Sequence, residues 1–83
     1  MAEVRLTEAQ VRALRALDAL GRTGSRVLAM EIERAPMVAA NLANSLVEKC
    51  MVDRVEPFGY RNPARWLIND LGRRWLAEHD HAG

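Results

Sequence analysis

The sequence predicts a mainly helical α+β domain in which three helices precede a β-hairpin and a final helix. Two observations in the sequence predict the order of these elements. Apolar residues recur at helical spacing through the first half of the chain and again near its end. Between these regions, a segment rich in proline, glycine and asparagine, residues 56–63, separates two short apolar runs, as in a hairpin.

Length and composition indicate one small domain. The chain has 83 residues, of which 49% are hydrophobic but only 5% aromatic, so its core favours helices over a large sheet. We expect a single domain over residues 1–83 with an ordered core over about 6–78. The 12 basic and 11 acidic residues give a formal net charge of +1. Any positive surface that binds nucleic acid must therefore be concentrated on one face.

The first helix is predicted from about Glu8 to Leu20. Thr7 and Gln10 stand three residues apart, which is the spacing of a capping box, and Gly21 is a natural stop. Its apolar positions follow helical spacing and are Val11, Leu14, Leu17 and Leu20.

A second and a third helix follow with a short turn between them. Ser25 is expected to cap the second, which contains Leu28 and Ile32. Pro36 ends it and begins the third, which extends to Glu48. One stripe of the third helix should face the core and consists of Ala39, Leu42, Ala43 and Leu46. The outward set consists of Ala40, Asn41, Asn44, Ser45 and Glu48.

The pattern changes after the third helix. Met51, Val52 and Val55 suit a short strand, and residues 64–68 read as the returning strand. Asn69 can cap a last helix from Asp70 to about Glu78, which should bury Leu71, Trp75 and Leu76. A helix-turn-helix followed by a β-hairpin is a winged helix-turn-helix fold. An all-helical bundle is the alternative.

Two segments resemble winged-helix regulators of the MarR type. LVEKCMVDR, residues 46–54, is similar to the stretch that ends their recognition helix and opens the wing, and LINDLGRRWL, residues 67–76, is similar to their wing-to-helix junction. Cys50 and Glu33 depart from the pattern, because each stands where the family has a turn glycine. We expect no counterpart here of the long terminal helices through which MarR-type proteins dimerise. The resemblance implies a fold and a DNA-binding surface.

In such regulators, the outward face of the third helix enters the major groove, and flanking cations meet phosphates. Asparagine can make paired hydrogen bonds to adenine, and serine can contact most bases. The resemblance implies that the outward positions of the third helix contact DNA. The cations that flank the helices and the wing are the remaining predicted contacts. The predicted DNA-binding residues are Arg22, Arg26, Arg34, Met37, Ala40, Asn41, Asn44, Ser45, Lys49 and Arg61.

Other chemistry-bearing residues have simpler interpretations. Trp66 and Trp75 are expected in the core, and Cys50 as a small buried hydrophobe. His79, Asp80 and His81 form an incomplete metal-ligand set near the end of the chain. No phosphate-binding glycine loop or paired-acid motif is present in the sequence, so we expect neither an enzyme nor a bound cofactor or metal.

The function predicted from the sequence is sequence-specific binding of double-stranded DNA by a small transcriptional regulator, as a homodimer on a two-part site. The alternative is a protein–protein interaction module, an accessory or phage-type factor, on the same scaffold. Phe58 and Tyr60 at the wing tip could form its partner-binding patch. A single cysteine, no secretory signal and no apolar run long enough for a membrane span lead us to expect a cytoplasmic protein.

Overall fold

The computed structural model describes residues 5–55 and 64–79 of the chain. These residues form α1 (Glu8–Leu20), α2 (Ser25–Ile32), α3 (Pro36–Glu48), β1 (Val52–Val55), β2 (Arg65–Ile68) and α4 (Asp70–His79). The order is the predicted one, and the two strands exclude the all-helical bundle.

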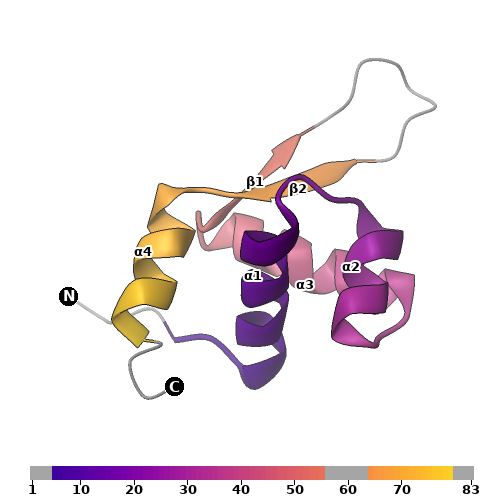
Figure 1. Cartoon of the computed structure of the whole chain (residues 1–83), viewed down its shortest axis with the longest axis horizontal. Coiled ribbons are helices and arrows are strands. Elements are labelled where there is room, and N and C mark those ends of the chain that lie inside the picture. Colours follow the sequence, from indigo (N-terminus) through magenta and orange to yellow (C-terminus); the bar gives the residue numbers. More distant parts are fainter. Residues whose placement is uncertain (1–4, 56–63, 80–83) are drawn as a thin grey trace.

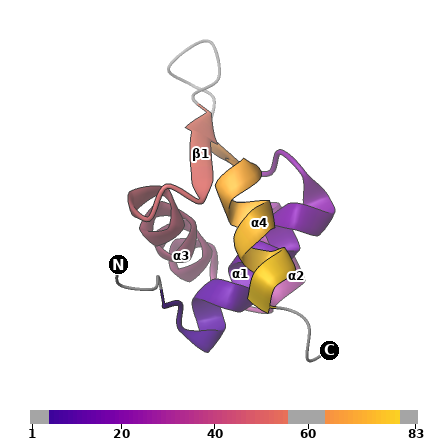
Figure 2. The same ribbon diagram turned by 90° about the vertical axis from the view of Figure 1, so that its left-hand side faces the viewer.

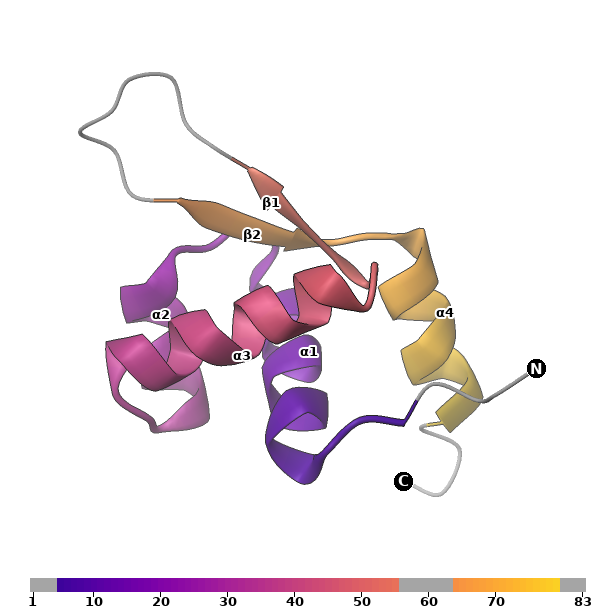
Figure 3. The same cartoon turned by 180° about the vertical axis from the view of Figure 1, so that it is seen from behind.

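α1 occupies the centre of the helical body, where it contacts the other three helices and β2. α3 crosses one side of α1, with α2 at one end of the molecule and α4 at the other (Figures 1 and 3). The hairpin of β1 and β2, which we call the wing, lies along one edge of this body. Figure 2 shows β1 rising away from the body between α3 and α4.

Local signals set the bounds of α1. The Thr7 hydroxyl accepts a hydrogen bond from the Gln10 amide at 3.1 Å, and the Gln10 side chain accepts one from the Thr7 amide at 2.9 Å. This is the predicted capping box. At the other end, Gly21 has φ 74°, a backbone conformation that glycine adopts without strain. The predicted start and stop of α1 are both confirmed.

The caps of α2 and α3 are weaker. Gly24 is the N-cap of α2 and supplies no side-chain hydrogen bond, so the prediction that Ser25 caps this helix is wrong: Ser25 is its first residue. Glu33 follows α2 in the left-handed conformation, with φ 57° and ψ 47°. Pro36 is the first residue of α3 after Ala35, as predicted. Because both helix starts lack side-chain caps, packing must supply much of their stability.

The wing is antiparallel, with Val52 opposite Ile68 and Val55 opposite Arg65. A third segment joins it that the sequence did not reveal. The Thr23 amide donates to the Trp66 carbonyl at 3.0 Å, and the Trp66 amide donates to the Thr23 carbonyl at 2.8 Å. The loop between α1 and α2 is thereby fixed to the outer edge of β2, and the wing is anchored to the helix-turn-helix.

The core lies where the inner faces of α1, α2 and α3 meet the wing. It includes Leu14, Leu28, Leu46 and, as predicted, Trp66, which is 4% exposed. Trp75 packs against this cluster while only partly buried, and its ring stacks on His79 with centroids 4.1 Å apart.

Two predictions of burial are wrong. Leu71 is 45% exposed, because it lies on the outer side of α4, whereas Leu76 is buried against the core. Cys50 is exposed rather than buried. It occupies a turn with φ 64° between α3 and β1, so its side chain is directed away from the core that Met51 enters.

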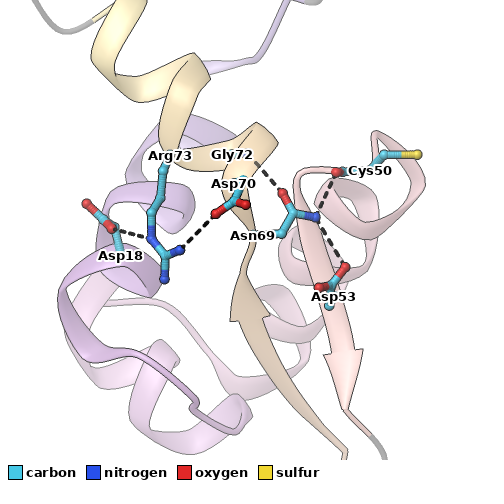
Figure 4. A network of polar contacts seen from close by, with 7 residues as sticks. All are labelled: Asp18, Cys50, Asp53, Asn69, Asp70, Gly72 and Arg73. Carbon is cyan, nitrogen blue, oxygen red and sulfur yellow. Dashed lines mark hydrogen bonds and ion pairs between the residues drawn. The ribbon is translucent and has the colours of Figure 1, made fainter.

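Asn69 joins the end of α3, the wing and α4 (Figure 4). Its Oδ1 accepts a hydrogen bond from the Gly72 amide at 3.0 Å, which confirms the predicted cap. Its Nδ2 donates to the Cys50 carbonyl at 2.8 Å and to Asp53 Oδ1 at 3.2 Å. One side chain therefore fixes the direction in which the wing leaves the body.

Gly72 allows α4 to approach that junction closely. A Cβ at this position would collide with the Met51 carbonyl oxygen and lie 2.7 Å from Cγ1 of Ile68. On the other side of α4, Arg73 reaches Asp18 of α1 at 3.8 Å and Asp70 at 3.5 Å (Figure 4). α4 is thus held against both the wing and α1.

Candidate nucleic-acid interface

The exposed part of α3 is concentrated near its first two turns. Met37 is 76% exposed, Val38 is 42% exposed, and Asn41 is exposed one turn further along. Residues three and four apart lie on one face of a helix, so these three side chains are neighbours. We call them the α3 outer face. The helix has no lysine or arginine from Pro36 to Glu48.

Asn44 and Ser45, two other predicted contacts, have partners inside the molecule. The Trp66 indole donates a 3.1 Å hydrogen bond to Asn44 Oδ1. Ser45 Oγ accepts from Gln10 Nε2 at 3.0 Å and donates to the Leu42 carbonyl at 2.7 Å. Both residues are half-buried. These bonds tie α3 to the wing and to α1, so Asn44 and Ser45 have a structural role whether or not they touch DNA.

Two further predicted positions lie outside the α3 outer face. Ala40 is half-buried and packs against the core. Its side chain is a single methyl group, which leaves room for a close approach to α3. Lys49 follows the last turn of α3 and is half-buried. The exposed side chain with hydrogen-bonding capacity on the first two turns of α3 is therefore Asn41.

Three of the predicted arginines are exposed around the helix-turn-helix. Arg22 lies in the loop after α1, Arg26 in the first turn of α2, and Arg34 in the turn before α3. None of them has an ion pair with another residue in the ranges 5–55 and 64–79. The predicted contact Arg61 lies outside the described residues.

A pocket that the sequence did not predict lies beside the start of α2. It is lined by Gly24, Ser25, Arg26, Val27 and Arg65, and we call it the basic notch. No side chain caps α2, so no side-chain acceptor bonds to the first amide groups of this helix. Helix starts of this kind favour the binding of anions.

Arg65 is the residue that sequence reasoning missed in the notch. It is the first residue of β2, where it is exposed beside the buried Trp66. Strand alternation was the available signal, since it places Arg65 on the face opposite to Trp66. Its proximity to Arg26 comes from the Thr23 bridge, which no local pattern predicts.

One acidic residue beside the helix-turn-helix is paired with a cation of α1. Glu33 lies 3.2 Å from the guanidinium of Arg12, so part of its charge is neutralised across the α1 side of the molecule. α2, the start of α3 and the start of β2 lie at one end of the molecule, opposite to α4 (Figures 1 and 3). The exposed side chain of Asn41 and the arginines of the basic notch, Arg26 and Arg65, therefore lie at the same end of the molecule.

Comparison with solved structures identifies this arrangement. A MarR family transcriptional regulator from Silicibacter pomeroyi superposes with a TM-score of 0.76 at 19% identity, over 88% of this chain and 49% of that one. The chain has the winged-helix fold. BpsR of Bordetella bronchiseptica, whose DNA binding is regulated by 6-hydroxynicotinic acid, gives a TM-score of 0.82 at 17% identity, over 94% of this chain and 59% of that one.

A variant of Lactococcus lactis ZitR in complex with DNA gives a TM-score of 0.77 at 16% identity, over 95% of this chain and 53% of that one. This winged helix thus spans about half the length of the MarR-type structures it matches. No protein-family model matches the chain, and neither does any curated protein.

Several predictions fall outside the described residues. These are the wing-tip patch of Phe58 and Tyr60, and the Asp80 and His81 part of the histidine tract. Residues 5–55 and 64–79 contain no cluster of three side chains able to hold a metal ion. None of the described helices combines the length and the apolar character that a bilayer crossing requires.

Proposed function

We propose that this winged helix is a small transcriptional regulator that binds specific double-stranded DNA sequences. The observation that carries the proposal is the position of Asn41, exposed on the crossing helix of a helix-turn-helix with unpaired arginines at the same end among the described residues. α3 would enter the major groove, and the wing would lie along the neighbouring backbone. The likeness of its fold to MarR-type regulators supports this orientation.

The proposed contacts divide by chemistry. The Asn41 amide would read a base edge, with Met37 and Ala40 beside it, because an asparagine can hydrogen-bond both N6 and N7 of adenine. Arg22, Arg26, Arg34, Lys49 and Arg61 keep their predicted role as phosphate contacts, and Arg65 joins them. Phosphate contacts position the protein without reading sequence.

We further propose that the protein acts as a homodimer on a two-part site. The α3 outer face carries one hydrogen-bonding side chain, and a single such face specifies few base pairs. Two copies related by a two-fold axis would double the readout and require half-sites about one helical turn apart. Sedimentation of the protein with and without a two-part duplex measures this directly.

The proposal is tested by Asn41→Ala. We expect the variant to bind a selected duplex about tenfold or more weakly, since a good bidentate pair contributes about 1–3 kcal/mol of discrimination. Its free energy of unfolding should stay within about 0.5 kcal/mol of the unmodified protein, as for other exposed substitutions. Arg74→Ala, on α4 at the opposite end, is the matched control and should leave DNA affinity unchanged.

A protein-interaction module is the second candidate, and a specific observation favours it. Met30 and Met37 are 80% and 76% exposed, which is unusual for large apolar side chains. Failure of the protein to bind any duplex at low salt would contradict DNA binding. The exposed methionines would then be the first surface to test against a protein partner.

A further inference from the structure

The chemistry of the α3 outer face indicates which bases it can recognise. Two of its three side chains, Met37 and Val38, are apolar and exposed, and they lie within one turn of the Asn41 amide. From Pro36 to Val47 the helix carries no charged residue at all. Met37 and Val38 have no donor for a phosphate oxygen, so their contacts in a DNA groove would be with base edges.

The base edges of the major groove differ in the groups they present. Adenine offers N7 and an N6 amino group, which match an asparagine amide, and thymine offers O4 and a C5 methyl group, which matches an apolar side chain. Guanine is most often read by arginine or lysine, and α3 has neither. Placing Met37 over a G·C pair would remove water from polar groups without replacing their hydrogen bonds, which is costly.

We propose that the α3 outer face reads A·T pairs, with Asn41 on adenine and with Met37 and Val38 packed on the C5 methyl groups of thymines. The inference rests on the proposed function and adds the class of sequence that is bound. Specificity then comes substantially from methyl contacts, and the phosphate contacts of the basic notch supply affinity without sequence preference.

Met30 provides a matched control. It is as exposed as Met37, at 80% against 76%, but it lies on α2 rather than on the α3 outer face. Substituting alanine at either position removes a similar exposed side chain, and neither change opens a cavity. A difference between the two variants therefore reports position and not the general loss of a methionine.

The experiment begins with selection of bound duplexes from a random-sequence pool by the full 83-residue chain. Each thymine of the enriched site is then replaced singly by deoxyuridine, which removes the C5 methyl group and keeps the base pairing. At contacted positions we expect affinity to fall about fourfold per methyl, the effect of burying one such group. In the Met37→Ala or Val38→Ala variant, deoxyuridine at the thymine that the replaced side chain contacts should no longer lower the affinity. In the Met30→Ala variant, every such loss should remain.

The outcomes separate the two proposals. An enriched site bound equally well with thymine and uracil, or a G·C-rich core under α3, overturns the methyl-reading inference and leaves sequence-specific DNA binding intact. A uracil penalty that Met37→Ala and Val38→Ala leave unchanged also overturns it. Enrichment of no sequence at all contradicts the proposed function, and the inference fails with it.

Discussion

Gly72 is a position where backbone packing dictates the residue. A side chain there would collide with the Met51 carbonyl and the Ile68 side chain, so α4 can dock at the foot of the wing only through glycine. We predict that Gly72→Ala lowers the free energy of unfolding by about 3 kcal/mol, the upper end of overpacking costs, as measured by urea denaturation.

Gly24→Ser is the control for this substitution. An added Cβ at Gly24 would meet only the Ala64 carbonyl oxygen, at an ordinary 3.9 Å, and serine could cap α2. The stability of this variant should match or slightly exceed that of the unmodified protein. Equal losses from both substitutions would show that the close approach at Gly72 is not what requires glycine.

At the residue scale, the sequence identified unusual backbone positions better than side-chain environments. Cys50 and Glu33 replace expected turn glycines, and both do adopt positive φ, at 64° and 57°. Helical spacing also placed Asn41, Asn44 and Ser45 off the core stripe. It did not predict that Trp66 and Gln10 would bond to Asn44 and Ser45, because those partners approach from other elements.

At the scale of elements, two polar side chains hold the wing in position relative to α3. One is Asn44, which accepts the hydrogen bond of the buried Trp66 indole. We predict that Asn44→Ala destabilises the fold by about 1–3 kcal/mol, because a buried donor loses its partner. Asn44→Asp keeps an acceptor oxygen and should retain most of the stability in thermal unfolding. A neutral Asn44→Ala would contradict this structural role.

The other is Asn69, which combines a helix cap with two bonds across the junction. We predict that Asn69→Ala lowers the free energy of unfolding by about 2 kcal/mol, with contributions from the cap and from the bridge. Asn69→Thr can keep the cap but not the bridge, and should lose about half as much. If Asn69→Thr is as stable as the unmodified protein, the bridging bonds of Nδ2 contribute nothing, and if it is no more stable than Asn69→Ala, the cap contributes nothing.

The elements themselves were largely predictable, since α1, α3 and the two strands carry strong local signals. The bridge between Thr23 and Trp66 was not, because one residue pair leaves no periodic pattern in the sequence. That bridge brings the loop before α2 to the start of β2. The basic notch therefore depends on tertiary structure, and Arg65 could be assigned to it only from the folded structure.

At the scale of the whole molecule, the net charge of +1 conceals an uneven distribution. Arg22, Arg26 and Arg34 are exposed around the helix-turn-helix, and Arg65 adds to them from the wing. At the opposite end, Arg73 lies close to Asp18 and Asp70, so its charge is partly neutralised. A nearly neutral chain can thus present a local cationic surface to phosphates.

The most direct test of the proposed interface is the salt dependence of DNA binding, followed by fluorescence anisotropy for the unmodified protein, the double variant Arg26→Ala/Arg65→Ala, and Arg74→Ala. Each phosphate contact contributes about 0.9 to the slope of log affinity against log salt. We predict that the double variant loses about two units of slope, while Arg74→Ala matches the unmodified protein. An unchanged slope in the double variant, or an equal loss in Arg74→Ala, would contradict DNA binding through the helix-turn-helix and the start of β2.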